Sequence, residues 1–482
     1  MAELTPAPPR PRALPHVVVV GAGISGLTAA WELTRSGEFT VEVLEAADVV
    51  GGVLQRAEVG GVVLDVGAES MLARRPEGVD LVRDAGLADA LVHPATARAS
   101  VRSPGRLDPL PSGTLMGVPR SADAVEGFLA PAEVARVRAE PDLPAPPLTE
   151  DVAVADYVAA RVGQAVVDRL VEPLLGGVYA GHAAQLSLRA TVPALWQHAV
   201  RGGSLLHAIA EPPAASSAPV FAGLRGGLAT LPRTLAERLR ERGAVVATST
   251  PVTRLERRPD GWLVDTARCS RHADAVVVAV PAPAAARLLA EPVPAAAAEL
   301  RGVETASVVI AALAVPAGEL SGLTGSGLLV PPAVAAVEGL RAKALTLSGN
   351  KWDWVGDQRG DRPGGTAVLR VSLGRAGETE ALGAEDADVV RWATADASRL
   401  LGRDLHPVEH AVVRWVDGLP QYAVGHLDRV ERLRAAVGAA GRLAVCGSVL
   451  DGVGIPACVG AARRAAAQVR AELAPAWGRM RA

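Results

Sequence analysis

The sequence predicts an α/β fold, and three segments support this prediction. Residues 17–20 are four consecutive valines, which is typical of a strand buried on both faces, and a glycine-rich turn leads from it into a helix. Residues 41–45 form a second predicted strand, which ends in an acidic residue. Residues 442–469, near the other end of the chain, repeat the order of strand, glycine turn and helix.

The turn after the first strand has the pattern G-x-G-x-x-G, in which each glycine has its own task. Gly21 allows the tight turn, Gly23 lets the backbone approach a diphosphate, and Gly26 lets the helix and strand pack closely. N–H groups at the start of the helix then face the diphosphate. Glu45 stands where an acceptor for a ribose hydroxyl is expected. These features predict a Rossmann-like dinucleotide site, and a strand–helix turn without a ligand is the alternative.

The composition is that of an ordinary globular enzyme. The 482 residues are 49% hydrophobic and 21% charged, and the formal net charge is -3 without any block of like charges. This balance gives no support to a nucleic-acid partner.

Cysteine usage, together with the lack of a signal-peptide pattern and of a transmembrane pattern, predicts a cytoplasmic location. Cys269, Cys446 and Cys458 are widely spaced and form no C-x-x-C, which indicates a reducing compartment and no thiolate metal site. The first fifteen residues lack the apolar stretch of a signal peptide. The longest run without charge, 320–337, contains two adjacent prolines and is excluded as a transmembrane helix. Peripheral contact with the inner face of a membrane stays open.

The elements between the two ends follow in chain order. A hairpin is predicted after the second strand, with Gly60–Gly61 between its arms. Apolar residues recur at helical spacing over residues 151–175. Residues 275–280 are again a buried type of strand, closed by Pro281, and residues 303–437 alternate short apolar strands with polar turns. Because nucleotide-binding elements are spread along the chain, we expect interleaved domains.

The fingerprint alone does not separate NAD(P) from FAD, but two glycine loops favour FAD. Residues 48–52 and 65–70 follow the second strand and the hairpin, and both suit an extended cofactor lying under several loops. Ordinary turn chemistry is the alternative. Only one complete fingerprint is present, so no second site for a nicotinamide is predicted. Electrons are therefore expected to enter from an organic substrate and leave to molecular oxygen.

With these loops, the chain resembles the superfamily of flavin amine oxidases and protoporphyrinogen oxidases. The N-terminal part of the resemblance lies in Glu45, Gly51–Gly52 and residues 67–70. Four further stretches resemble the porphyrinogen oxidase branch, namely 171–181 (VEPLLGGVYAG), 223–228 (GLRGGL), 414–426 (RWVDGLPQYAVGH) and 452–458 (GVGIPAC). Residues 369–375 (LRVSLGR) add to the match with bacterial members. Together they span most of the chain, which is most similar to Gram-positive members that act on coproporphyrinogen III.

The resemblance implies both a fold and a reaction. The fold is α/β, with a Rossmann-like FAD-binding domain of the GR2 flavoprotein type, interleaved with a mixed-sheet substrate domain and a mainly helical insert. The reaction is the oxidation of coproporphyrinogen III to coproporphyrin III in heme biosynthesis. Six electrons leave the macrocycle in three flavin cycles, and oxygen becomes hydrogen peroxide. Protoporphyrinogen IX is the alternative substrate.

The domain boundaries follow from placing these stretches along the chain. The FAD-binding domain is predicted to comprise residues 16–72, 222–290 and 438–482, the helical insert residues 100–210, and the substrate-binding domain residues 73–99 and 291–437.

The family pattern also implies the residues that contact FAD. They are Gly21, Ala22, Gly23, Ile24, Ser25 and Gly26 in the turn, Glu45 and Ala46 after the second strand, Gly52 and Val53, Gly67, Ala68, Glu69 and Ser70, Val252, Trp415, and Val453, Gly454 and Ile455. The last three lead a helix N-terminus towards the flavin ring, where it would stabilise negative charge. Relatives often carry Arg or Lys where Val53 stands, which leaves Arg56 as a substitute. A core tryptophan is the alternative for Trp415.

For the substrate, the family pattern implies Gly177, Arg98 and Lys351. The backbone of Gly177 matches a glycine that lines the pocket, and Arg98 matches a basic residue that binds a propionate, with Arg102 and Arg106 as competitors. A solvated surface position is the alternative for these basic residues. His182 and His426 are acid–base candidates by residue type only, so no catalytic residue is predicted.

Two rival functions share this fold. Amine oxidases usually present an aromatic cage near the flavin, whereas Val449 stands at that place and the chain has only 3 tyrosines. No cysteine follows Gly425, where covalently flavinylated members carry one, so the predicted FAD is non-covalent. The other rival, a binding protein without flavin, would show a degraded fingerprint.

Overall fold

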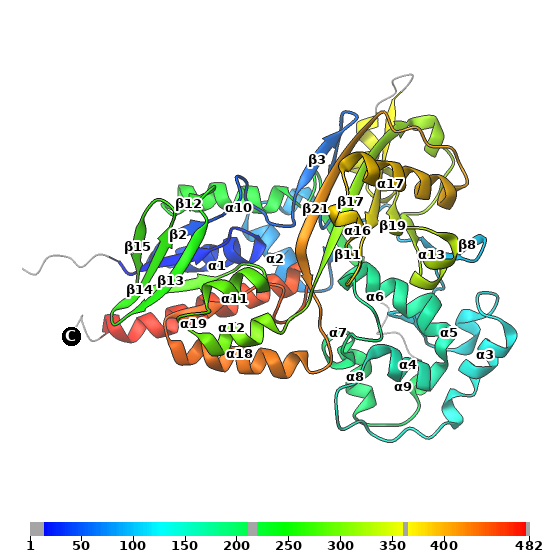
Figure 1. Ribbon diagram of the computed structural model, residues 1–482, viewed down its shortest axis with the longest axis horizontal. Coiled ribbons are helices and arrows are strands. Elements are labelled where there is room, and N and C mark those ends of the chain that lie inside the picture. Colours follow the sequence, from blue (N-terminus) through cyan, green and yellow to red (C-terminus); the bar gives the residue numbers. More distant parts are fainter. Residues whose placement is uncertain (1–13, 211–218, 360–364, 479–482) are drawn as a thin grey trace, which may run out of the picture.

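The computed structural model describes residues 14–210, 219–359 and 365–478. Within these ranges the chain forms an elongated molecule with two lobes, one holding both ends of the described chain (Figure 1). The expectation about a signal peptide concerns residues that lie mostly outside the described part.

The first lobe is built on a five-stranded parallel sheet. Its order is β12 (Val245–Ala247), β2 (Thr40–Leu44), β1 (His16–Val20), β16 (Ala275–Val278) and β22 (Leu443–Val445). Val17, Val18 and Val19 are fully buried, as expected for a strand covered on both faces. Strands from the beginning, middle and end of the chain meet here, so the predicted α/β class with interleaved segments is confirmed.

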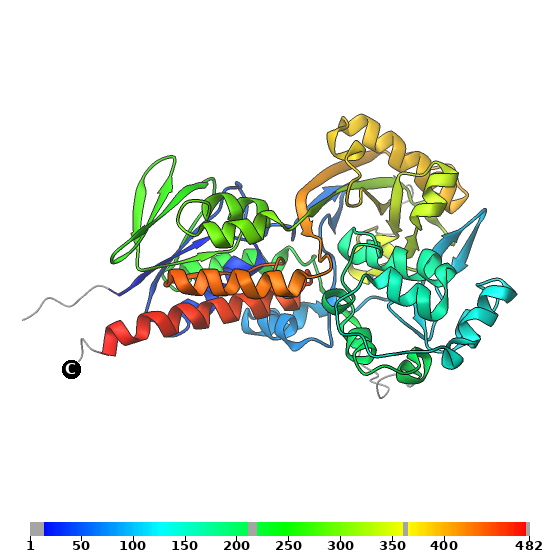
Figure 2. The same ribbon diagram turned by 60° about the horizontal axis from the view of Figure 1, so that its bottom comes forward.

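Helices cover both faces of this sheet. α1 (Ile24–Thr34) packs against the C-terminal helix α19 (Ile455–Gly478) and against α10 (Thr230–Glu241). Figure 2 shows α19 beside α18 (His426–Ala440) along the underside of the lobe. Further elements here are α2 (Pro76–Asp84), α11 (Ala282–Leu288), α12 (Pro294–Arg301) and an antiparallel sheet of β13 (Val252–Arg258), β14 (Gly261–Thr266) and β15 (Ser270–Ala273).

The second lobe is organised by a seven-stranded mixed sheet. Its order is β21 (Glu409–Pro420), β17 (Thr305–Pro316), β20 (Thr366–Leu373), β19 (Ala342–Thr346), β18 (Gly327–Leu329), β7 (Ala99–Ser103) and β8 (Arg106–Pro109). Within this sheet β18 and β7 pair in parallel and the other pairs are antiparallel. α17 (Asp386–Leu401) covers one face; α13 (Pro332–Glu338), α14 (Ser348–Lys351), α15 (Asp353–Gly356) and α16 (Glu380–Gly383) lie in its connections.

The helical region has its own apolar core. It contains α3 (Pro131–Arg138), α4 (Val154–Val162), α5 (Gln164–Val166), α6 (Glu172–Tyr179), α7 (Leu188–Thr191), α8 (Pro193–Ala199) and α9 (Leu205–Ile209), preceded by the hairpin of β9 (Thr114–Leu115) and β10 (Val118–Pro119). The helix predicted over residues 151–175 is interrupted, because α4 ends at Val162 and the next residue, Gly163, has a φ of +98°, which is not helical. A π-helical turn, Val167–Val171, then leads into α6.

Short strands connect the two lobes. The predicted hairpin is confirmed as β3 (Arg56–Val59) and β4 (Val62–Asp65), with both Gly60 and Gly61 at positive φ. β11 (Phe221–Leu224) pairs with β5 (Met71–Leu72) and β6 (Leu91–Val92).

The strand pairings differ from two predicted domain boundaries. Residues 100–109, placed in the helical insert, belong to β7 and β8, because β7 completes its hydrogen bonds with β18 of the mixed sheet. Residues 91–92, placed in the substrate domain, pair with β11 of the segment predicted for the cofactor domain. The other boundaries stay predictions.

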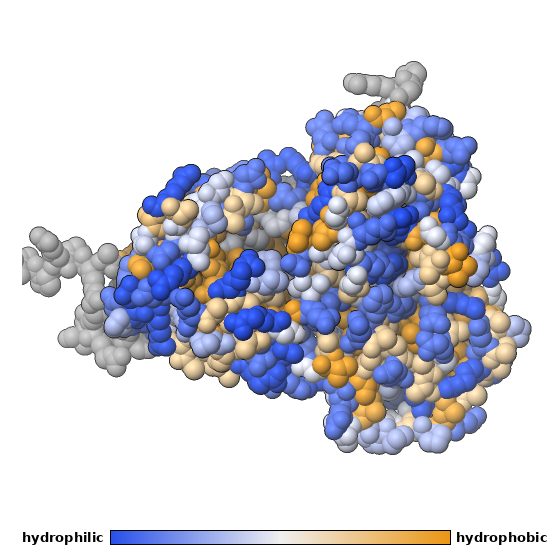
Figure 3. Space-filling view, in the orientation of Figure 1, coloured by the Kyte–Doolittle hydropathy of each residue, from blue (hydrophilic) through white to orange (hydrophobic). Residues whose placement is uncertain are grey.

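The described part of the chain shows neither a membrane-spanning helix nor a cluster of metal-binding side chains. No helix in the described ranges is long and apolar enough to cross a bilayer. The described residues also contain no group of three or more His, Cys, Asp or Glu that could hold a metal ion. The face drawn in Figure 3 is mostly hydrophilic, with small separate hydrophobic patches.

Candidate cofactor and substrate site

The glycine turn between β1 and α1 is packed tightly on one side and open on the other. A Cβ on Gly26 would lie 1.9 Å from the Gly21 carbonyl oxygen, and a Cβ on Gly21 would lie 2.6 Å from the Ala279 oxygen. In contrast, nothing lies within 4 Å of the Cβ position of Gly23. Gly23 is also the N-cap of α1, and no side chain caps this helix end. An open, uncapped N-terminus is suited to an anionic group.

Glu45 lies at the end of β2, beside this turn. Its carboxylate accepts from the backbone N–H of Ala22 at 2.6 Å and of Ala47 at 2.9 Å. A carboxylate has about four acceptor positions, so capacity is left for a hydroxyl. The Thr250 N–H donates to the Glu45 carbonyl oxygen at 2.7 Å, which brings Val252, at the start of β13, close to this end of the turn.

Two more glycine loops approach from the other side. Gly51 forms an isolated bridge with Gly23, and a Cβ on Gly52 would lie 3.4 Å from the Gly23 Cα. A Cβ on Gly67 would lie 1.8 Å from the Val53 carbonyl oxygen, so only glycine allows these two loops to touch. The exposed side chain of Val53 has no charge, and exposed Arg56 lies on β3.

Residues 67–70 are held by an ion-pair network from the mixed sheet and the helix after β19. Glu69 pairs with Lys351 of α14 at 2.5 Å and with Arg370 of β20 at 2.8 Å. Arg370 also donates to the Gly67 carbonyl oxygen at 2.8 Å. Burial opposes ionisation of Glu69, but the two cations lower its pKa to about 2. The indole N–H of Trp415 donates to the carbonyl oxygen of Val66 at 2.9 Å and so fixes the residue just before this loop.

Asp65, at the end of the hairpin, is a buried carboxyl behind the same loop. Burial raises its pKa to about 6, although it accepts from the N–H groups of Leu228 and Ala229. A Cβ on Gly227 would lie 2.6 Å from its Oδ1, which explains the glycine at this position, and the adjacent Gly226 has a φ of +83°.

The third part of the site is the loop before α19. Val453 and Gly454 precede Ile455, the first residue of α19, so the N-terminus of this helix opens beside the loop. The buried hydroxyl of Tyr422 donates to the Ser448 carbonyl oxygen and accepts from the Gly452 N–H at 2.8 Å. Tyr422 therefore fixes both ends of the segment that leads into the helix.

The predicted substrate glycine lies on α6. Gly177 is exposed, and a Cβ there would lie 3.6 Å from the Cδ2 atom of Leu329 on β18. α6 thus approaches the mixed sheet with its glycine face, close to β18 and β19.

The predicted basic substrate residues are placed differently from one another. Arg98 is exposed, and its backbone oxygen accepts from the Ser326 N–H at 2.8 Å, so its structural contribution is to β18. Lys351 is only partly exposed and is paired with Glu69. Arg102 is paired with Glu338 at 3.0 Å and Arg106 with Asp108 at 3.0 Å.

The two histidine candidates are held by contacts with neighbouring side chains. Burial lowers the pKa of His426 to about 4, and its ring is stacked on Tyr422 with centroids 3.9 Å apart. His182 is bonded to Glu172 at 2.9 Å, which raises its pKa. Both side chains have structural partners.

Three residues that organise the site were not singled out from the sequence, namely Asp65, Arg370 and Tyr422. The signal for Arg370 is a charged residue inside an apolar strand, Ala367–Leu373. The signal for Asp65 is its place directly before the second glycine loop, and Tyr422 is one of only 3 tyrosines.

Comparisons with known proteins agree on one family. A family model described as flavin-containing amine oxidoreductase matches residues 24–470. A coproporphyrinogen III oxidase of Mycobacterium tuberculosis is 43% identical over 460 residues, which cover 94% of this chain and 96% of that protein. The Bacillus subtilis coproporphyrinogen III oxidase is 30% identical over 92% of this chain and 95% of its own.

A solved structure shows the same architecture. The crystal structure of an Exiguobacterium sp. 255-15 protein, assigned by its name to the protoporphyrinogen oxidases, superposes with a TM-score of 0.84 at 29% identity. The match covers 95% of this chain and 99% of that one.

Proposed function

The chain belongs to the family of flavin-containing amine oxidoreductases, and from this premise we propose that it is an FAD-dependent oxidase that converts coproporphyrinogen III to coproporphyrin III. Two observations together carry the proposal. The glycine turn forms an open cradle at Gly23, and relatives that match nearly the full length of the chain are named coproporphyrinogen III oxidase. Loss of six electrons from the macrocycle, in three steps, is balanced by reduction of three oxygen molecules to hydrogen peroxide.

The described residues fit FAD. The open position at Gly23 and the uncapped start of α1 suit a diphosphate, and Glu45 keeps acceptor capacity for a ribose hydroxyl. The loops at 51–53 and 67–70 and the N-terminus of α19 surround the extension of that cradle. When bound, the flavin supplies the acceptor for a hydride from the substrate.

Non-covalent binding of FAD is part of the proposal. His426, not a cysteine, follows Gly425. Cys446 and Cys458 are buried, and burial raises the pKa of both thiols, to about 11 for Cys458. Neither is therefore suited to form a thioether with the flavin.

The protein's own residues hold the loops that surround the cofactor cradle. The Glu69 network holds the 67–70 loop against the cofactor cradle, and Tyr422 holds the loop before α19. The positive end of the α19 dipole would stabilise negative charge on a bound flavin. Because both histidine candidates have structural partners, we propose no side chain as a general base.

Protoporphyrinogen IX is the second candidate substrate, and the name of the Exiguobacterium structure favours it. The two substrates differ in charge, since coproporphyrinogen has four propionates and protoporphyrinogen has two, with vinyl groups in place of the others. An amine oxidase activity is disfavoured because Val449 is buried where an aromatic wall is expected.

A side-by-side assay tests the proposal. Purified holoenzyme is given each porphyrinogen in air, and porphyrin fluorescence and hydrogen peroxide are followed. We expect faster turnover of coproporphyrinogen III, with three peroxides per porphyrin. Equal or faster turnover of protoporphyrinogen IX would contradict the substrate assignment.

A further inference from the structure

Lys343 has an unusual place in the mixed sheet. In the pairing of β19 with β20, Ala342 faces Leu373 and Ala344 faces Ser372, so Lys343 is the extra residue of a β-bulge. A bulge redirects a side chain at the point where a sheet meets a functional region. Its neighbours Ala342 and Leu345 belong to the apolar core of the sheet.

The side chain of Lys343 is largely buried, and its ammonium group has no partner among the described residues. The residue is only 7% exposed, and no hydrogen bond or ion pair joins its Nζ atom to any residue that the structure describes. The Nζ atom itself is not completely shielded from solvent. An isolated buried ammonium is strongly unfavourable unless an anion reaches it.

The surrounding charges do not compensate Lys343. Buried Arg375 lies nearby, and burial together with this second cation lowers the pKa of Lys343 to about 7. Glu378 opposes this effect, but it already pairs with Arg375 at 3.4 Å and its side chain is 45% exposed. Glu172 is committed to His182 and to the Ala183 N–H. Arg375 and the protonated form of Lys343 therefore share one half-exposed carboxylate, that of Glu378.

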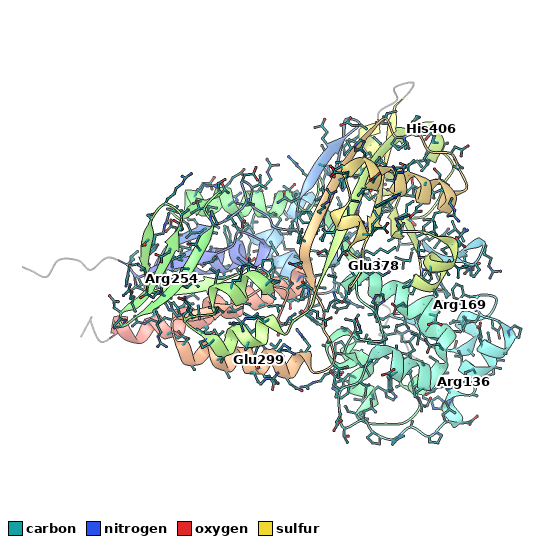
Figure 4. The ribbon with its side chains drawn as sticks, viewed as in Figure 1. Arg136, Arg169, Arg254, Glu299, Glu378 and His406 are labelled. Atoms are coloured by element: carbon teal, nitrogen blue, oxygen red, sulfur yellow. The ribbon has the colours of Figure 1, made fainter. Side chains whose placement is uncertain are left out.

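This pair of cations lies beside the wall formed by Gly177 and Leu329. The Nε atom of Arg375 is 4.0 Å from the Cβ position of Gly176 on α6. Arg375 also donates to the Val330 oxygen at 2.8 Å, and the Val330 N–H donates to the Lys343 oxygen at 2.9 Å. Figure 4 shows Glu378 where the mixed sheet meets α6, at the same junction.

We propose that Lys343, supported by Arg375, binds a carboxylate of the substrate at the end of the wall formed by Gly177 and Leu329. The inference rests on the proposed function, because a macrocycle with several propionates supplies the carboxylate. A guanidinium and an ammonium together match one carboxylate, with the arginine already oriented by Val330. The ligand completes a charge balance that the unliganded protein lacks.

Replacement of Lys343 separates binding from a structural role. Lys343→Met removes the charge and keeps a long apolar side chain, and Lys343→Arg keeps the charge. If Lys343 serves a ligand, the unliganded Lys343→Met holoenzyme should melt at the same temperature as the wild type or higher, because an uncompensated buried charge is gone. A purely structural lysine would lower the melting temperature instead.

The binding measurement uses coproporphyrin III, which carries the same four carboxylates as the proposed substrate. Quenching of its fluorescence by holoenzyme gives the dissociation constant. We expect Lys343→Met to weaken binding about tenfold or more, Lys343→Arg to recover most of the loss, and Arg391→Met, an exposed charge on α17, to change nothing. In turnover, KM should rise with kcat little changed.

Each outcome decides between the two proposals. Unchanged coproporphyrin binding by Lys343→Met, or a lowered melting temperature with unchanged KM, overturns the role of Lys343. If the wild type oxidises neither porphyrinogen but binds coproporphyrin in a Lys343-dependent way, the proposed function fails and the carboxylate site stands. If the wild type neither binds nor oxidises, both proposals fall.

Discussion

Single residues decide whether the cofactor cradle is open. Gly23 and Gly26 are both part of the fingerprint, yet their surroundings differ, because a Cβ meets no atom at Gly23 and would lie 1.9 Å from the Gly21 oxygen at Gly26. Gly23 also has an extended backbone with φ -68°, which alanine adopts without strain. The two glycines therefore have different roles, because Gly23 leaves space for a ligand and Gly26 allows close packing.

Gly23→Ala should separate flavin binding from folding. We expect the flavin-free variant to melt like the wild type, and its flavin affinity to fall about tenfold or more, because the new Cβ occupies space next to the diphosphate. Flavin fluorescence titration measures the affinity. Gly438→Ala in α18, which also meets no neighbour within 4 Å, is the matched control and should bind flavin normally. Normal flavin binding by Gly23→Ala would show that the diphosphate lies elsewhere.

Asp65 should make stability depend on pH. The pKa of Asp65 is about 6 in the folded protein, whereas its ordinary value, which applies to the unfolded chain, is 3.8. Between these two pH values the folded protein therefore binds more protons than the unfolded chain does. Stability from this group is therefore lost as pH rises from about 4 to 6, by up to about 3 kcal/mol. Urea unfolding of wild type and Asp65→Asn at several pH values measures it. A difference between the two proteins that is constant with pH would contradict the assignment.

At the scale of elements, β20 positions the loop of residues 67–70 through one side chain. Arg370 contacts both Glu69 and the Gly67 carbonyl oxygen, and it is buried. Lysine keeps the charge but lacks the fork that reaches both acceptors.

Arg370→Lys should weaken both the fold and flavin binding. We expect the free energy of unfolding to fall by about 2 kcal/mol or more, because a buried hydrogen bond is lost while Glu69 stays charged. Chemical denaturation and flavin titration measure the two effects. Arg341→Lys, whose partner Glu380 is exposed, is the control and should change stability by less than about 1 kcal/mol. Equal effects at both positions would refute the special role of Arg370.

The loop before α19 depends on Tyr422 in the same way. Tyr422→Phe keeps the ring, which is stacked on His426, but removes the hydroxyl that joins Ser448 and Gly452. We expect a loss of about 1–2 kcal/mol and weaker flavin binding, because the loop at the α19 N-terminus is no longer fixed. Tyr157→Phe, a partly buried tyrosine in α4, is the control. Unaltered flavin binding by Tyr422→Phe would remove this loop from the cofactor site.

At the scale of the whole molecule, local patterns were predictable and distant pairings were not. The valine strand, the glycine turn and the hairpin at Gly60–Gly61 each follow from neighbouring residues. The contact of Arg370 with Glu69 joins residues 301 positions apart, and no local pattern encodes it. The place of β7 in the mixed sheet likewise depends on pairing with β18, where Ala99 faces Gly327.

The site itself is a product of this topology. Both ends of the chain contribute a helix N-terminus, α1 and α19, to the first lobe, while Gly177 and Leu329 come from the second. The predicted contacts of individual residues with FAD and substrate stay predictions, since their roles need the bound ligands.

Anaerobic reduction of the bound flavin by coproporphyrinogen III tests the central claim most directly. Holoenzyme is mixed with the porphyrinogen without oxygen, and the visible absorbance of the flavin is followed. We predict bleaching of the flavin at a rate at least equal to turnover, return of the colour when oxygen is admitted, and no bleaching by NADPH or putrescine. A flavin that stays oxidised with coproporphyrinogen III, or that is bleached by NADPH or putrescine, would contradict it.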